Sequence, residues 1–225
     1  MNDELNGLKS TATGVADADV TAAATDLSTL INTLCPNGVE WKTIGEVAKI
    51  TRGKVISKPF IQNNPGKYPV YSSQTENDGC MGYIDSYMFD GDYVTWTTDG
   101  ANAGTVFYRT GKFNTTNVCG LLAPNQHIIS PKYLSYILGT KAKSYVSRGM
   151  GNPKLMSNTM SKVRIPVPPL PVQAEIVRIL DQFSTLAEDI TAGLPAEIAA
   201  RQAQYEYYRN QLLSFKDVSD RAPGC

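Results

Sequence analysis

The stretch that decides the fold is Ile165-Pro166-Val167-Pro168-Pro169-Leu170-Pro171-Val172-Gln173. Its prolines impose an extended backbone and prevent a helix from starting before the last of them. Beyond it, apolar residues recur at alternating steps of three and four, at Ile176, Ile179, Phe183, Leu186 and Ile190. This narrow heptad seam is typical of a helix that pairs with another helix. The sequence therefore predicts a globular body that ends at residue 165 and a helical dimerisation and spacer region over residues 166–215.

A second seam follows the sequence Gly193-Leu194-Pro195, which breaks or bends the helix. The seam consists of Leu194, Ile198, Arg201, Tyr205, Tyr208, Leu212 and Phe215. An apolar stripe more often packs on its own domain, but two successive seams exceed what a small body needs for cover. We therefore expect coiled-coil-like pairing of these helices, and the continuity of the helix through the break is left open.

Upstream of the prolines, short β-like runs alternate with turns that contain Gly, Asn and Asp. The runs are Val39–Ile44, Tyr68–Tyr71, Tyr93–Thr97, Thr105–Arg109, Val118–Leu122 and Val163–Val167. One helix opens at Pro131 and lines one face with Tyr133, Leu134, Ile137 and Leu138. The predicted fold class is α+β, a mixed globular domain over residues 26–165 followed by long C-terminal helices. Residues 1–25 and 216–225 are predicted to be flexible tails.

The charges of this chain are sorted along the sequence. The whole chain is neutral, with 21 basic and 21 acidic residues, yet no Asp or Glu lies between Gly100 and Ala174. That stretch contains Arg109, Lys112, Lys132, Lys141, Lys143, Arg148, Lys154, Lys162 and Arg164. A basic body beside an acidic remainder favours a polyanion bound by one part of the chain, because phosphate contacts respond to local charge.

The sequence offers no catalytic or metal-binding constellation. His127 is the only histidine, no other ligand is spaced to join it in a zinc site, and it has no plausible serine or cysteine partner for a triad. The run Gly100–Gly104 lacks the Lys-Ser/Thr of a phosphate-binding loop. The cysteines, Cys35, Cys80, Cys119 and Cys225, are scattered, which favours the reducing cytoplasm. No signal peptide and no membrane span is expected. The sequence thus predicts a cytoplasmic protein with no cofactor that is not an enzyme.

Several motifs, in their order and spacing, resemble one family. The start Trp41–Val47 is similar to its Trp-x-x-hydrophobic-Gly-Glu-Val opening, and the junction Ile165–Gln173 is the strongest match. Further similar landmarks are Tyr68–Ser73, Asp90–Val94, Gly100–Tyr108 and Gln202–Arg209. On these residues the chain resembles the specificity (S) subunit of type I restriction–modification systems. It holds one target-recognition domain and one conserved helical region, whereas full subunits hold two of each, so it resembles a half-length form.

The resemblance implies a non-enzymatic role. S subunits bind double-stranded DNA and dock DNA adenine methyltransferase subunits, which use S-adenosylmethionine, and the implied partners extend to restriction subunits. This chain would then read one half-site and pair as a homodimer through its helices. If continuous, residues 171–215 would span about 65 Å at ~1.5 Å per residue, near the length of two DNA turns of ~34 Å. Whether the chain is a natural half-subunit or part of a longer one is left open.

Four loops combine cations, which suit phosphates, with amides and hydroxyls, which suit base edges. They supply the predicted DNA-binding residues Arg52, Lys54, Lys58, Ser73, Gln74, Thr75, Asn77, Thr98, Asn102, Arg148, Asn152 and Lys154. The predicted dimer or partner helix residues are Ile176, Ile179, Phe183, Leu186, Ile190, Ile198, Tyr205, Tyr208 and Leu212. The alternative function is a protein-interaction or assembly factor with a basic face and a helical dimerisation arm. A weaker third hypothesis is an unrelated nucleic-acid enzyme.

Overall fold

The computed structural model describes residues 26–147, 151–189 and 195–215, with the backbone alone for 186–189 and 195–199. Both predicted tails, Arg148 and Ile190 lie outside the described residues, as do the side chains of Leu186 and Ile198. The chain divides into two compact units. One, the body, contains Glu40–Leu170, and the other, the helical unit, contains the described residues up to Val39 and those from Pro171 onward.

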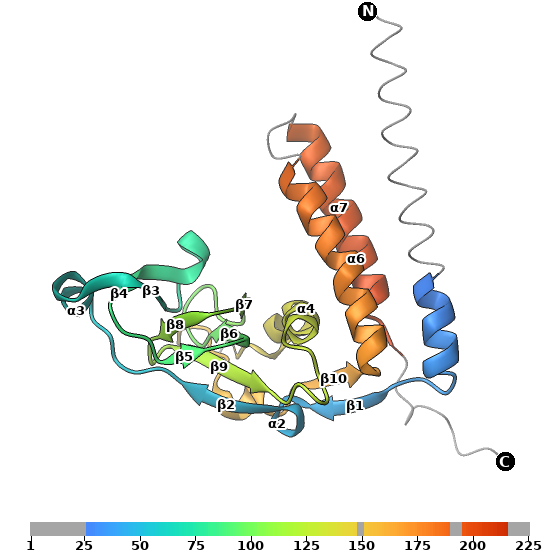
Figure 1. Ribbon diagram of the computed structural model, residues 1–225, viewed down its shortest axis with the longest axis horizontal. Coiled ribbons are helices and arrows are strands. Elements are labelled where there is room, and N and C mark those ends of the chain that lie inside the picture. The colour runs from blue at the N-terminus through green and yellow to red at the C-terminus, as the bar shows by residue number, and fades with distance from the viewer. Residues whose placement is uncertain (1–25, 148–150, 190–194, 216–225) are drawn as a thin grey trace, which may run out of the picture. The chain divides into compact units, whose positions relative to one another are not determined.

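The centre of the body is a four-stranded antiparallel sheet in the order β2-β9-β6-β7 (Figure 1). Its strands are Ala48–Arg52, Cys119–Pro124, Tyr93–Thr97 and Val106–Arg109, in that order. Helix α4, Pro131–Lys141, packs against β6, β7 and β9. Its four predicted core residues are all fully buried, which confirms the stripe inferred from their spacing.

A second four-stranded sheet has the order β4-β3-β8-β5. Its strands are Cys80–Ile84, Pro65–Tyr71, Lys112–Thr115 and Phe89–Asp90, and the pairing of β3 with β8 is parallel. The short helix α3, Lys58–Asn63, precedes β3 and contacts β4. Tyr71, Phe89 and Tyr93 surround the buried ring of Phe113 at centroid distances of 5.5–5.7 Å. Aromatic packing therefore forms the core beside this sheet.

The two ends of the body chain meet in a small ladder. Strand β1, Glu40–Thr43, pairs antiparallel with β10, Arg164–Val167, so the Trp41 region lies opposite the proline-rich junction. The one-turn helices α2, Ile44–Val47, and α5, Ser157–Met160, adjoin this ladder. The amides of Ile44 and Gly45 donate to the carbonyls of Val163 and Ser161 at 2.9 and 3.0 Å. The last strand before the junction thus closes the domain on its first strand.

One close approach fixes the central sheet. Gly120 on β9 pairs with Trp96 on β6, and a Cβ added at Gly120 would lie 2.3 Å from the Trp96 ring. The Trp96 indole is fully buried, and its Nε1 donates to the Leu155 carbonyl at 2.8 Å. The missing side chain of Gly120 is what lets the indole lie flat across β9 and reach the loop that contains Leu155.

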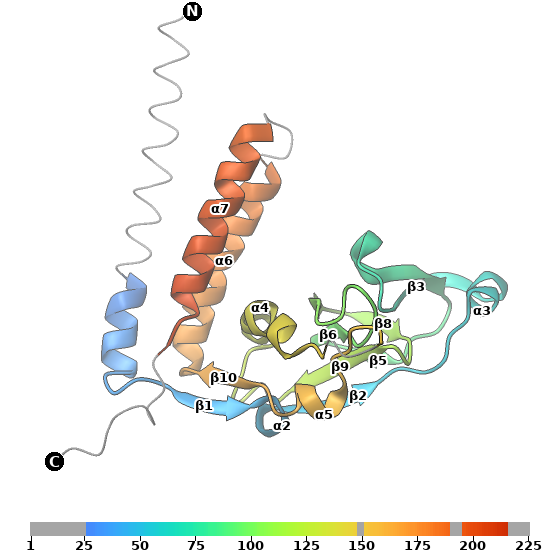
Figure 2. The same ribbon diagram turned by 180° about the vertical axis from the view of Figure 1, so that it is seen from behind.

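The helical unit consists of a helix over residues 26–34, α6 (Leu170–Asp189) and α7 (Pro195–Leu212). Helices α6 and α7 lie side by side in both views (Figures 1 and 2). Ile176 and Ile179 are buried, and the rings of Phe183 and Tyr208 stack with centroids 5.4 Å apart. These four residues of the predicted seams therefore pack within the chain. Two further seam residues on α7, Tyr205 and Leu212, are half-buried.

The sequence left open whether the helix continues through Gly193-Leu194-Pro195. The structure describes two helices, α6 up to Asp189 and α7 from Pro195, whose ring and missing N–H favour the first helical position. The seams predicted to meet a second chain also meet each other, since Phe183 stacks on Tyr208. The helix at residues 26–34 belongs to the helical unit rather than to the body, in which the sequence had placed it.

Candidate nucleic-acid interface

The four loops singled out in the sequence are joined by hydrogen bonds at the ends of the strands of the body. The loop 97–104 pairs through its backbone with the segment 151–155. The amide of Gly100 donates to the Pro153 carbonyl at 3.0 Å, and the amide of Leu155 donates to the Thr98 carbonyl at 2.8 Å. Ser147 and Lys154 exchange two further backbone bonds of 2.9 and 3.0 Å. These loops therefore form one structural element, although the stretch between Gly104 and Ser147 would span about 140 Å if extended at ~3.3 Å per residue.

The loop 72–79 is attached to the same element by side chains. Asn102 Nδ2 donates to Thr75 Oγ1 at 3.0 Å, and Ser73 Oγ lies 3.2 Å from Asp99 Oδ1. The carbonyl of Val118 accepts hydrogen bonds from both Ser73 Oγ and Thr98 Oγ1. The turn that contains Val118 thus connects two of the loops.

The fourth loop, residues 52–58, joins through Thr115 and Thr116. The amide of Lys54 donates to the Thr115 carbonyl at 3.2 Å, and a Cβ added at Gly53 would lie 1.7 Å from that carbonyl oxygen. Thr116 in turn donates its amide to the Tyr71 carbonyl at 2.9 Å and its hydroxyl to Ser72 Oγ at 3.1 Å. We call the described residues of the four joined loops, 52–58, 72–79, 97–104, 147 and 151–155, the loop cluster.

Five of the predicted DNA-binding side chains are exposed in the loop cluster and have no hydrogen bond or ion pair to other described residues. They are Lys54, Lys58, Asn77, Asn152 and Lys154. Their ammonium and amide groups are free to meet a ligand. Arg148 lies outside the described residues.

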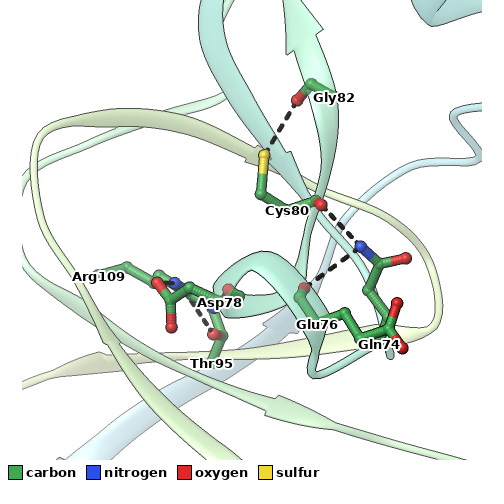
Figure 3. Close-up of polar contacts among 7 residues, drawn as sticks. All are labelled: Gln74, Glu76, Asp78, Cys80, Gly82, Thr95 and Arg109. Atoms are coloured by element: carbon green, nitrogen blue, oxygen red, sulfur yellow. Dashed lines mark hydrogen bonds and ion pairs between the residues drawn. The ribbon is translucent and has the colours of Figure 1, made fainter. Parts of the chain in front are cut away.

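The remaining predicted side chains bond inside the protein. Ser73, Thr98 and the pair Thr75–Asn102 link loops to each other, as described above. Gln74 Nε2 donates to the Cys80 carbonyl at 2.6 Å (Figure 3), and Arg52 Nε donates to Ser157 Oγ at 3.2 Å. These side chains stabilise the conformations of the loops. Each would have to break an existing hydrogen bond in order to contact a base.

Sequence reasoning missed Asn117, which is exposed in the turn between Thr116 and Cys119. The turn is closed by a bond of 3.1 Å from the Cys119 amide to the Thr116 carbonyl. Asn117 follows the Thr116 backbone that contacts the loop 72–79 and precedes the Val118 carbonyl that joins two loops. Its signal in the sequence was only the polar run Asn114–Asn117, which is also typical of an ordinary turn.

The basic residues of the acid-free stretch do not form one outward face. Arg109 is 3% exposed and pairs with Asp78, while Lys112 lies 3.8 Å from Asp90. Lys141 lies over the Trp41 ring, 4.6 Å from its centroid, and burial lowers the pKa of its ammonium group. Of the described basic residues of that stretch, Lys154 is exposed in the loop cluster, where it is joined by Lys54 and Lys58 from outside the stretch.

Buried titratable groups near the loop cluster are held in neutral form. Burial raises the pKa of the Cys119 thiol to about 12, and burial also raises the pKa of the Tyr71 hydroxyl. The geometry of the site suits binding by exposed cations and amides.

Comparison with known proteins shows the family. The family model described as the type I restriction modification DNA specificity domain matches residues 36–200, so the chain belongs to this family. The chain is 43% identical over 172 residues to a putative type I specificity subunit of Mycoplasma pneumoniae, covering 76% of this chain and 72% of that one. A second such protein, designated an N-terminus, is 46% identical over 178 residues and is covered to 95%.

The fold is similar to that of a solved structure. The S subunit of the type I restriction–modification system from M. genitalium matches 68% of this chain with a TM-score of 0.57 at 17% sequence identity. The match covers 41% of that chain, so this chain spans less than half of the length of that subunit. The family inferred from the motifs is thereby confirmed, together with the mixed helix and strand fold.

The homologues are named specificity subunits, which are the non-catalytic components of restriction–modification systems. The prediction that this chain is not an enzyme is confirmed on that ground. Within the described ranges, no helix is both long and apolar enough to span a membrane.

Proposed function

We propose that the body reads double-stranded DNA with the loop cluster, as the recognition subunit of a type I restriction–modification system. The observation that carries the proposal is that four loops, separate in sequence and each predicted to bind DNA, are joined by hydrogen bonds, either directly or through the residues 115–118. Membership of the DNA specificity domain family supports the same function.

Two kinds of contact are expected from this surface. The ammonium groups of Lys54, Lys58 and Lys154 bind phosphates and hold the body on the duplex. The amides of Asn77, Asn117 and Asn152 offer a donor and an acceptor each, which is what the edge of a base pair presents in the major groove. The lysines would supply sequence-independent affinity, and the amides would supply specificity.

We further propose that one chain reads one half-site and that two chains pair through their helical units. One recognition domain contacts too few base pairs to select a site in a genome, and two-fold pairing is the usual way in which identical chains associate. The read sequence would then be an inverted repeat around an unread spacer. If this chain is part of a longer subunit, a second, different recognition domain would read the other half-site.

The catalytic partners proposed for this subunit are DNA adenine methyltransferase subunits, joined by restriction subunits, in the cytoplasm. The chain itself supplies recognition and a docking scaffold. The rival function is an assembly factor whose basic surface binds an acidic protein. DNA is favoured because exposed asparagines accompany the lysines of the loop cluster, and amides match base edges.

The test uses the purified full chain, alone and together with the methyltransferase subunit of its own system. The chain alone should bind duplex DNA with a steep salt dependence and transfer no methyl groups, and methylation should need both proteins. Methyl transfer, nuclease or ATPase turnover by the chain alone would contradict the proposal. Salt-insensitive binding of DNA, or none at low salt, would favour the assembly factor.

A further inference from the structure

Arg109, the last residue of β7, is a buried cation. Its side chain is 2% exposed, and its guanidinium carbon lies 3.6 Å from the centre of the Tyr71 ring and 4.4 Å from that of Phe107. Nε donates to Thr95 Oγ1 at 3.2 Å. A cation removed from water in this way requires a charged or strongly polar partner.

That partner is a single residue of the loop 72–79. Arg109 forms an ion pair with the Asp78 carboxylate and also donates to the Asp78 backbone carbonyl at 2.6 Å (Figure 3). The guanidinium therefore binds both the side chain and the backbone of Asp78. Its planar group of several N–H donors makes this double contact possible. The contact joins the central sheet to the tip of a loop on the second sheet.

Asp78 lies in an unusual backbone turn. Asn77, Asp78 and Gly79 have φ values of +48°, +54° and +77°, three consecutive residues in the left-handed region. For the two that are not glycine, this conformation costs roughly 1–2 kcal/mol each before local hydrogen bonds are counted. Such a turn persists when surrounding contacts hold it. Arg109 holds it at Asp78, and the Ser72 amide holds it by donating to the Gly79 carbonyl at 3.0 Å.

The turn presents Asn77. The Asn77 side chain is exposed and makes no hydrogen bond to other described residues, whereas the side chains of Gln74 and Thr75 are bonded to Cys80 and Asn102. An asparagine amide can bind adenine through N6 and N7 together in the major groove. A rigid turn keeps that amide in one orientation, which a pair of simultaneous hydrogen bonds requires.

We infer that Asn77 reads an adenine in the major groove and that Arg109 is the positioning residue that holds its turn. The inference rests on the proposed function of the loop cluster. Arg109 itself does not touch DNA, since its charge is buried and paired with Asp78. Arg109, which belongs to the acid-free basic stretch, thus contributes to specificity by ordering the loop 72–79.

The test compares three variants of the full chain and distinguishes a loss of DNA sequence selectivity from a loss of stability. Asn77→Gly removes the amide but tolerates positive φ, so it should leave the thermal unfolding midpoint unchanged or raised. Arg109→Lys keeps a charge and loses the fork, and Asp78→Asn keeps the backbone carbonyl and loses the ion pair. Each protein selects from a pool of duplexes with randomised sequence, and the enriched duplexes are sequenced. Binding is also measured as a function of salt.

The wild type should enrich one sequence, and Asn77→Gly should lose discrimination at one A·T pair by roughly one to two orders of magnitude, as expected for a bidentate amide contact. Arg109→Lys and Asp78→Asn should relax that same position with the salt slope unchanged. A purely structural role would lower the unfolding midpoint without relaxing one particular position.

Three results would overturn the inference. Asn77→Gly could retain the wild-type sequence in full, or its relaxed position could be a G·C pair. Arg109→Lys, if folded, could lower binding equally at every position with a reduced salt slope, which would make Arg109 a phosphate contact. If Arg109→Lys does not fold, Asp78→Asn decides the point alone. A wild type that enriches no sequence would instead contradict the proposed function.

Discussion

The ring of Phe183 on α6 stacks on the ring of Tyr208 on α7, with centroids 5.4 Å apart and an interplanar angle of 17°. Both residues belong to apolar seams whose heptad spacing predicted pairing with another helix. Within this chain, the two seams pair with each other at this point. Stacked aromatic pairs stabilise by about 0.5–1.5 kcal/mol beyond the apolar area that they bury. The pair therefore fixes how the two helices face each other.

Phe183→Asp should lower the free energy of unfolding of the helical unit by about 1–3 kcal/mol, because an unpaired charge would replace a ring in an apolar contact. Gln182→Asp introduces the same charge at the exposed neighbouring position and should change stability by less than about 0.5 kcal/mol. Urea unfolding followed by circular dichroism provides the measurement. Equal effects of the two substitutions would show that the ring pair does not hold the helices together.

The wild type should be a dimer at micromolar concentration, with an inverted repeat as its DNA sequence, if two chains supply the two half-sites. Light scattering gives the mass, and mapping of methylated adenines in the presence of the methyltransferase gives the sequence. A monomer across that concentration range together with an asymmetric sequence would point to a second, different recognition domain.

Lys154→Glu should weaken binding to all duplexes alike and reduce the slope of log affinity against log salt by about one unit, because one phosphate contact is lost. The Arg148→Glu variant should behave in the same way. Lys162→Glu is the matched control, since Lys162 is also exposed but lies beside the β1–β10 ladder rather than in the loop cluster. A loss with Lys162→Glu that matches the loss with Lys154→Glu would indicate non-specific attraction by the whole body.

Gly120→Ala should destabilise the body by about 1–3 kcal/mol, because the added methyl group overlaps the Trp96 ring in a packed core. Gly139→Ala in α4 is the natural comparison, since nothing lies within 4 Å of a Cβ added there. It should stabilise by about 0.5–1 kcal/mol, the usual gain from removing a helical glycine. Thermal unfolding followed by tryptophan fluorescence reports on both, and the expectation fails if both variants melt like the wild type.

The Cys119 thiol should make stability depend on pH. Since burial raises its pKa to about 12, folding favours the neutral thiol, and this contribution is fully present below the ordinary thiol pKa of 9.0. It is lost as pH rises from 9.0 toward 12. Cys119→Ala removes the titration, so the stability difference between wild type and variant should shrink from about pH 8 to about pH 11. A constant difference in urea unfolding over this range would contradict the assignment.

The strands and helices that sequence reasoning found are those whose side chains carry a clear pattern. The runs at Tyr93–Thr97 and Thr105–Arg109 became β6 and β7, and the stripe after Pro131 became α4. Strands β2, β4 and β8 were not predicted, because Ala48–Arg52 and Lys112–Thr115 mix polar residues with apolar ones and Cys80–Ile84 is interrupted by a glycine. Pairing with neighbouring strands decides such segments more than their own propensity does.

By itself, the sequence determined that a mixed body ends at the proline-rich junction, that helices follow, and that the chain belongs to a family of DNA specificity subunits. Prolines and heptads act locally, so their consequences can be read without coordinates. Only the tertiary structure decided that Arg109 turns inward to Asp78, that Gln74 is bonded to Cys80, and that Asn77 is left free at the tip of a left-handed turn. These outcomes depend on how the folded chain pairs its side chains, as Arg109 does with Asp78 from 31 positions away, and burial changes what a charge or an amide can bind.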